Sequence, residues 1–216
     1  LLPKYDGCFC MIRMHRGKLD GVWSRTGEVV KSMDHIAEDI LLRYPDIAHA
    51  TERVVLLGEA WRRDAEFSSI SGEFRRQYPQ PQLGFAVFDW TWDKSEPGGV
   101  PVLWSNQPYS YRLELLQEAK PVMCNVFPPC PVECEDEAHA WRYATALKAM
   151  GGYDGAVCSN PNAAYAPGAG KGGEFIKLKP LSTYSLEVVA VEQSVGWKTG
   201  RRVGTPVVRF SSESGV

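Results

Sequence analysis

The sequence has no long apolar run, no strong excess of charge of one sign and no C-x2-C cysteine pair. No stretch of about 18 apolar residues occurs, so nothing predicts a membrane-spanning helix, and no signal peptide is visible. The 24 basic and 26 acidic residues give a net charge of −2, so any nucleic-acid contact must come from a local basic patch. The chain also begins without Met, and we expect it to be part of a longer protein.

Six cysteines are present, but none forms the C-x2-C pair that is typical of a zinc site. We therefore expect free thiols, as in a reducing cytoplasm. The 216 residues, of which 44% are hydrophobic and 23% charged, predict a globular protein with one domain, or one domain and part of a second.

Apolar periodicity and turn residues predict an α+β fold. The expected strands are 7–14, 22–30, 53–61, 83–90, 154–160 and 174–180. The expected helices are 33–44 with Ser32 as N-cap and Pro45 as the stop, 110–119 opening at Ser110, and 135–150. After Pro180, two strands joined by a basic turn predict the start of an all-β domain. The expected domains are therefore 1–183 and 184–216.

Several charged residues lie where a plain core would not place them. Glu59 ends an apolar strand, and Asp154 begins another. Lys177 and Lys179 alternate with apolar residues, which puts both on one face of a strand. Taken singly, each of them, and Lys4 as well, is read most simply as a surface charge.

Their order along the chain changes this interpretation. The segments are KYDG (4–7), SRTGE (24–28), LLGEAW (56–61), FAVFDW (85–90), YDGAV (153–157) and FIKLKP (175–180). This series resembles the covalent nucleotidyltransferase superfamily, which comprises ATP-dependent DNA ligases, RNA ligases and mRNA-capping guanylyltransferases. FSSISGEF (67–74) looks most like the small DNA ligases of bacteriophages. The resemblance implies a nucleotidyltransferase (ATP-grasp-like) domain with antiparallel sheets flanked by helices, followed by the start of an OB-fold.

The resemblance also implies roles for individual residues. Lys4 would be the catalytic nucleophile that takes AMP from ATP, and nearby cations would favour its neutral form. Lysines suit phosphate oxygens, carboxylates suit Mg²⁺, and an aromatic face suits a purine. The implied nucleotide-binding residues are Arg25, Glu59, Phe88, Lys177 and Lys179. Phe85 is the alternative to Phe88 for stacking on the purine. The implied Mg²⁺ ligands are Glu59 and Asp154, and the implied DNA-binding residues are Arg13, Lys198, Arg201 and Arg202.

The sequence departs from the family pattern at several positions. Phe9 stands where many relatives have Arg, and we expect Arg13 to supply the missing contact. Asp154 replaces the Glu of many DNA ligases and is common in capping enzymes. Ser159 replaces a frequent Lys, and Leu2 stands where some relatives have Glu. The basic last motif of the family is absent before Val216.

These observations favour an ATP-dependent DNA ligase that seals nicked duplex DNA. We expect it to act as a monomer in the cytoplasm, which would be that of a bacterial host if the gene belongs to a phage. An RNA ligase or capping guanylyltransferase of the same fold is the first alternative. A non-catalytic relative that binds nucleotide or nucleic acid is the second, and the intact set Lys4, Glu59, Lys177 and Lys179 argues against it.

Overall fold

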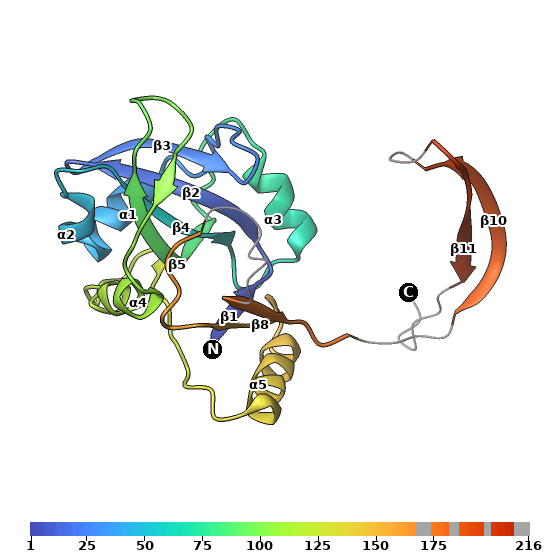
Figure 1. Cartoon of the computed structure of the whole chain (residues 1–216). Helices are drawn as coiled ribbons and strands as arrows, with labels where there is room; N and C mark the ends of the chain where they lie inside the picture. Colours follow the sequence, from blue (N-terminus) through green and yellow to red (C-terminus); the bar gives the residue numbers. More distant parts are fainter. Residues whose placement is uncertain (167–173, 182–185, 197–199, 210–216) are drawn as a thin grey trace. The chain divides into compact units, whose positions relative to one another are not determined.

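The computed structural model describes residues 1–166, 174–181, 186–196 and 200–209, which form two compact units (Figure 1). The first unit runs to Pro180 and the second begins at Leu181. The expected domain boundary between residues 183 and 184 lies outside the described residues.

A six-stranded sheet forms the larger part of the first unit. Its strands are β2 (Cys8–His15), β3 (Lys18–Ser24), β4 (Val54–Trp61), β5 (Gly84–Asp93), β6 (Leu103–Trp104) and β7 (Val126–Phe127). The order is β3-β2-β4-β5-β6 with antiparallel neighbours, and β7 pairs with β5 in parallel. The expected α+β class with largely antiparallel sheets is confirmed.

Four helices accompany this sheet. They are α1 (Ile36–Arg43), α2 (Pro45–Ala48), α3 (Phe67–Phe74) and α4 (Tyr109–Gln117). Ile36 and Ile40 of α1 and Leu116 of α4 are fully buried in one cluster with Leu56 and Phe85 of the sheet. Each such side chain contributes roughly 1.5–3 kcal/mol by leaving water, so this face of the sheet carries most of the core.

A smaller sheet brings together the first and the last motifs of the predicted site. Its strands are β1 (Leu2–Tyr5), β8 (Tyr153–Ser159) and β9 (Phe175–Leu178), in the antiparallel order β1-β8-β9. Helix α5 (Glu137–Ala149) packs against it through Ala144 and Leu147, which cluster with Ala156 and Leu178 (Figure 1). The sheet brings Lys4, at the start of the chain, beside residues more than 150 positions away.

Several expected element boundaries differ from the structure. Ser32 is not an N-cap, because its buried hydroxyl donates to the Phe74 carbonyl at 2.7 Å while α1 begins four residues later. Helix α4 begins at Tyr109, one residue before the expected Ser110. Helix α5 begins at Glu137, where the Asp136 carboxylate accepts from the His139 amide at 2.6 Å. Of these three helix starts, only that of α5 is capped by a side chain, and sequence periodicity places helix ends only to within a few residues.

The second unit contains one antiparallel hairpin, β10 (Glu187–Val195) with β11 (Arg202–Arg209). It agrees with the two strands expected after Pro180, whereas the OB-fold stays a prediction, since a lone hairpin is common to many β folds. In the part of the chain that is described, no helix has both the length and the apolar character needed to cross a membrane.

Candidate active site

Lys4 and Asp154 meet across the small sheet. Lys4 pairs with Gly155, the next pair is Tyr5 with Tyr153, and Asp154 is therefore an extra residue with no partner on β1. Such a bulge re-aims the side chain of the extra residue. Asp154 Oδ2 lies 2.9 Å from Lys4 Nζ.

Lys179 contacts the same carboxylate oxygen, with its Nζ 2.5 Å from Asp154 Oδ2. Partial burial would raise the pKa of Asp154, but the hydrogen bonds and charges of Lys179 and Lys4 outweigh this and hold the pKa below its ordinary value. A single carboxylate therefore fixes two ammonium groups at one point.

Glu59 is the second carboxylate of the site and lies directly opposite Phe9 of β2. Burial raises the pKa of Glu59 to about 7, although Arg25, Lys4 and Lys177 each favour its charged form. Its Oε2 is buried and has no hydrogen-bond partner among the described residues. A buried acceptor without a donor is costly, so this oxygen is suited to accept from a bound molecule.

Lys177 and Lys179 lie near different carboxylates. Lys177 pairs with Val157 on β8 and lies close enough to Glu59 to favour its ionisation. Lys179 follows β9 and is bound to Asp154. The expected convergence of both lysines on the Lys4 region is present, with one lysine near each carboxylate.

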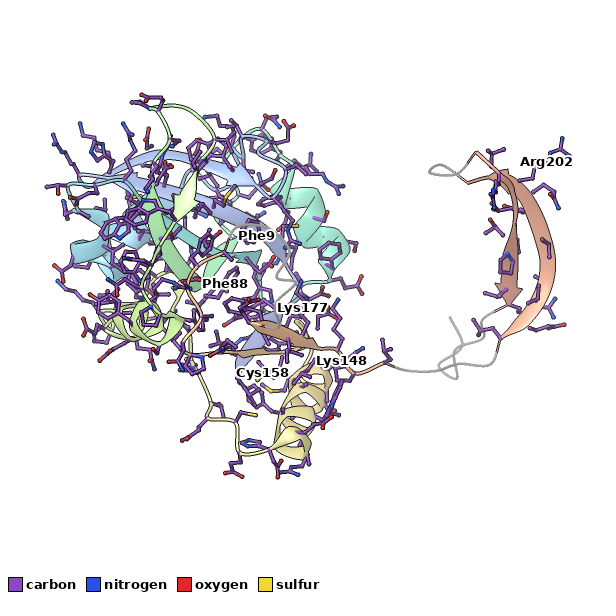
Figure 2. All side chains as sticks on the ribbon, in the orientation of Figure 1. Phe9, Phe88, Lys148, Cys158, Lys177 and Arg202 are labelled. Atoms are coloured by element: carbon purple, nitrogen blue, oxygen red, sulfur yellow. The ribbon has the colours of Figure 1, made fainter. Side chains whose placement is uncertain are left out.

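Phe88, and not Phe85, belongs to the face of the sheet that carries the site. The register between β4 and β5 shifts so that Phe88 has no partner residue on β4. The centre of its half-buried ring lies 6.1 Å from the centre of the Phe9 ring, and Figure 2 shows both residues labelled in the same region as Lys177. Phe85 is fully buried in the main core on the other face. Burial therefore supports Phe88 as the stacking residue.

A buried ion pair that the sequence analysis did not predict holds the strand next to Phe88. Arg112 of α4 donates from Nε to Asp89 Oδ1 at 2.7 Å and from Nη2 to Oδ2 at 3.0 Å. The Tyr109 hydroxyl donates to the Phe88 carbonyl at 2.9 Å. Asp89 beside Phe88 in a strand was a visible signal, but its partner 23 residues away was not.

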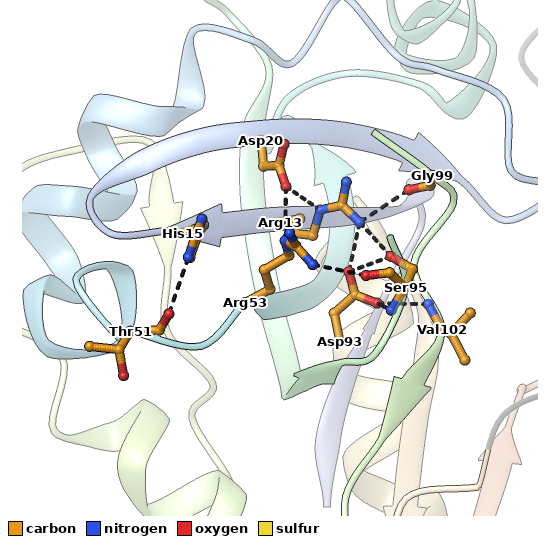
Figure 3. Close-up of polar contacts among 9 residues, drawn as sticks. All are labelled: Arg13, His15, Asp20, Thr51, Arg53, Asp93, Ser95, Gly99 and Val102. Carbon is orange, nitrogen blue, oxygen red and sulfur yellow. Dashed lines mark hydrogen bonds and ion pairs between the residues drawn. The ribbon is translucent and has the colours of Figure 1, made fainter. Parts of the chain in front are cut away.

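Arg13 is part of the fold. Its side chain is fully buried, with Nη1 2.6 Å from Asp93 Oδ2 and Nε 2.8 Å from Asp20 Oδ2 (Figure 3). Nη1 also donates to Ser95 Oγ and to the Gly99 carbonyl. The structure therefore contradicts the expectation that Arg13 contacts DNA, because its side chain is fully buried and its Nε and Nη1 lie against the carboxylates of Asp20 and Asp93.

The remaining expected residues stay predictions. Lys198 lies outside the described residues, and Arg202 is exposed at the start of β11. Leu2 is buried on β1, and Ser159 pairs with Phe175 at the end of β8. Within the described ranges no group of three or more His, Cys, Asp or Glu side chains could hold a metal by itself.

Comparison with known proteins gives the context for this geometry. No family model matches the chain. A "Probable DNA ligase" of Mycobacterium sp. (strain KMS) is 28% identical over 193 residues, which cover 89% of this chain and 33% of that protein. The ATP-dependent DNA ligase of bacteriophage T7, solved in complex with ATP, is similar in structure with a TM-score of 0.57 and 16% identity, covering 95% of this chain and 73% of that one.

The Chlorella virus DNA ligase-adenylate gives a TM-score of 0.55 at 16% identity, covering 96% of this chain and 72% of that one. The chain spans about a third of the length of the curated relatives it matches. The expected resemblance is confirmed both by these sequences and by the shared architecture. The chain is a homologue of the DNA ligases and has the nucleotidyltransferase fold of the ATP-dependent ones.

Proposed function

We propose that this chain is the catalytic part of an ATP-dependent DNA ligase, in which Lys4 takes AMP from ATP and passes it to the 5′-phosphate of a nick. The observation that carries the proposal is the shared contact of Lys4 and Lys179 with Asp154 Oδ2, beside the unpartnered Oε2 of Glu59. An isolated surface ion pair contributes little, whereas here two lysines share one carboxylate oxygen near a buried carboxylate oxygen that has no partner among the described residues.

The first step would be attack of Lys4 Nζ on the α-phosphorus of ATP. The Lys4 ammonium would first lose a proton to solvent; the N–P bond then forms as the bond from the α-phosphorus to the pyrophosphate oxygen breaks, and pyrophosphate leaves. Asp154 fixes the direction of the Lys4 side chain, so less orientational freedom has to be lost in the reaction. Lys177 and Lys179 would neutralise the charge that develops on the phosphate oxygens.

The nucleoside would be held by Phe88 and Glu59. The partly exposed Phe88 ring offers an aromatic face for the purine, and Glu59 Oε2 would accept a hydrogen bond from a ribose hydroxyl. Arg25 would contact the ribose or a phosphate oxygen.

The two carboxylates also fit a magnesium ion. Mg²⁺ usually binds through one or two carboxylates together with substrate phosphates, and Glu59 and Asp154 both lie around Lys4. Bound there, the ion would supply positive charge to the phosphate oxygens. Glu59 contributes a free buried oxygen, while Asp154 would exchange a lysine contact for the ion.

Nicked duplex DNA would be the partner of the whole protein, which we expect to be a cytoplasmic monomer. The 184–216 segment would begin an OB-fold domain and contact DNA through Lys198, Arg201 and Arg202. Positive side chains on a hairpin suit the phosphate backbone, since most protein–DNA hydrogen bonds go to phosphate and sugar.

The test is incubation of the full-length protein with ATP and Mg²⁺, followed by mass spectrometry of the intact protein and its peptides. We expect one AMP on Lys4, none in Lys4→Ala, and an unchanged adduct in the control Lys18→Ala, which removes an exposed lysine from β3. An adduct that survives Lys4→Ala would refute the nucleophile. Labelling by GTP, or sealing of nicked RNA alone, would support the capping enzyme or the RNA ligase.

A further inference from the structure

Arg25 differs from the buried arginines of this protein in how its guanidinium is held. It lies exposed in the turn after β3, which is closed by the Gly27 amide donating to the Ser24 carbonyl at 3.0 Å. Its guanidinium carbon lies 5.0 Å from the centre of the Phe9 ring. Among the described residues, Arg25 makes no hydrogen bond or ion pair with another side chain.

The Phe9 ring is packed against neighbouring side chains. Phe9 pairs with Glu59 across β2 and β4, and its ring packs 6.1 Å from Phe88 (Figure 2). Both rings are packed against a buried cluster that includes Met11 and Leu57. The ring therefore presents a fixed aromatic face toward Arg25.

A guanidinium on an aromatic face keeps its hydrogen-bond donors free. The ring quadrupole attracts the positive charge without accepting the N–H groups. Arg13 and Arg112 also lie over rings, those of Trp23 and Tyr109, but both are buried and paired with carboxylates, whereas Arg25 is exposed. Arg25 is also near Glu59, as are Lys4 and Lys177, so its charge lies in the region where the reacting phosphate would be held.

We infer that Phe9 is a positioning residue whose ring holds the Arg25 guanidinium in place to bind a phosphate group at the Lys4 site. The inference rests on the proposed function. It gives Phe9 a task of its own at a position where the sequence suggested only a lost contact, and it needs no compensation from the buried Arg13.

The phosphate could belong to ATP or to the 5′ end of the nick, and two assays separate these sources. The first follows AMP addition with varied ATP in single turnovers. The second follows sealing of a nicked duplex bearing a 5′-phosphate by protein that already carries AMP. Phe9→Leu should raise the half-saturating concentration of one substrate about three- to tenfold, with the maximal rate within about twofold.

The control variants decide whether Phe9 acts through Arg25. Phe9→Tyr keeps an aromatic face and should restore half-saturation to within about twofold. Phe9→Leu combined with Arg25→Ala should lose no more than Arg25→Ala alone, because the ring then has nothing to hold. Trp104→Leu, which removes the ring under Lys94 on the edge strand β6, should change neither assay. Additive losses, or no loss in Phe9→Leu, would overturn the inference.

A spectroscopic readout separates this inference from the proposed function. The Phe9 ring current should shift the side-chain protons of Arg25 upfield in NMR spectra of the parent and of Phe9→Tyr, and the shift should vanish in Phe9→Leu. A parent protein that forms no AMP adduct counts against the proposed function alone. Identical Arg25 shifts in the parent and Phe9→Leu would overturn the Phe9–Arg25 pairing whatever the activity.

Discussion

Lys4 Nζ lies 2.9 Å from Asp154 Oδ2, across two strands whose register shifts at this point. Phe88 also stands at a register shift, between β4 and β5. Asp154 and Phe88 are thus extra residues in their strands. Their side chains therefore need not follow the alternation of the neighbouring residues between the two faces of the sheet.

Asp154→Asn tests whether the carboxylate organises Lys4 and Lys179. The amide cannot form the two ion pairs, so we expect AMP addition to slow by about 10²-fold through misplacement of the nucleophile. The measurement is single-turnover adenylation with saturating ATP. Asp34→Asn is a matched control, because it removes an exposed pair with Lys31 at 3.7 Å, and an equal loss in both variants would refute a specific role for Asp154.

Lys177→Ala and Lys179→Ala test charge neutralisation by the lysine near the end of β9 and the lysine just after it. Both side chains are exposed, so we expect the free energy of unfolding to change by less than about 0.5 kcal/mol. Nick sealing should fall about 10²–10³-fold, the usual loss for one preorganised donor to a developing charge. Adenylation against pH should be changed more by Lys177→Ala. Parental rates with an unshifted profile would make Lys177 an ordinary surface charge.

Phe88→Ala and Phe85→Ala should separate binding from folding. Loss of base stacking at Phe88 should weaken ATP binding by about 1–3 kcal/mol with little change in melting temperature. Loss of the fully buried Phe85 ring should cost about 3–5 kcal/mol of stability by leaving a cavity. Titration with ATP and thermal unfolding measure the two effects, and the opposite pattern would move stacking to Phe85.

Asp93→Asn tests the buried contact with Arg13. Burial works against the charge of Asp93, but the Ser95 amide and the Arg13 guanidinium outweigh it and lower its pKa. A lowered folded-state pKa stabilises the protein above the unfolded-state pKa, and this stabilisation is lost as the pH falls through the folded value. At neutral pH the variant should lose about 3 kcal/mol, since Arg13 loses one of its buried partners.

The pH dependence provides the check on this explanation. Urea unfolding of the parent and of Asp93→Asn should give curves that converge as the pH falls below the ordinary aspartate range, where the parent carboxylate is also protonated. Glu187→Gln, in an exposed pair with Arg209, should change stability little at any pH. A difference that does not depend on pH would mean that lost packing, not charge, causes the effect.

The sequence by itself carried the order of the motifs, and the expected chemistry follows from that order. The segments around Lys4, Glu59, Asp154 and Lys177 were recognisable through their resemblance, in this order, to the motifs of the nucleotidyltransferase superfamily, whereas strand alternation and turn residues alone favoured surface charges. The same local rules predicted most strands and the approximate extents of three helices. They missed β1, because four residues carry too little periodicity and the strand exists only through its pairing with β8.

Tertiary structure alone decided which charges face the site. An arginine in the apolar strand β2 gives no local sign of Asp93, which lies 80 positions away and makes Arg13 a core residue. The turn after β3 likewise does not reveal that Arg25 lies over Phe9. The register shifts that present Asp154 and Phe88 arise between strands distant in sequence. Side-chain direction at such points depends on the pairing of two strands, which a single segment does not encode.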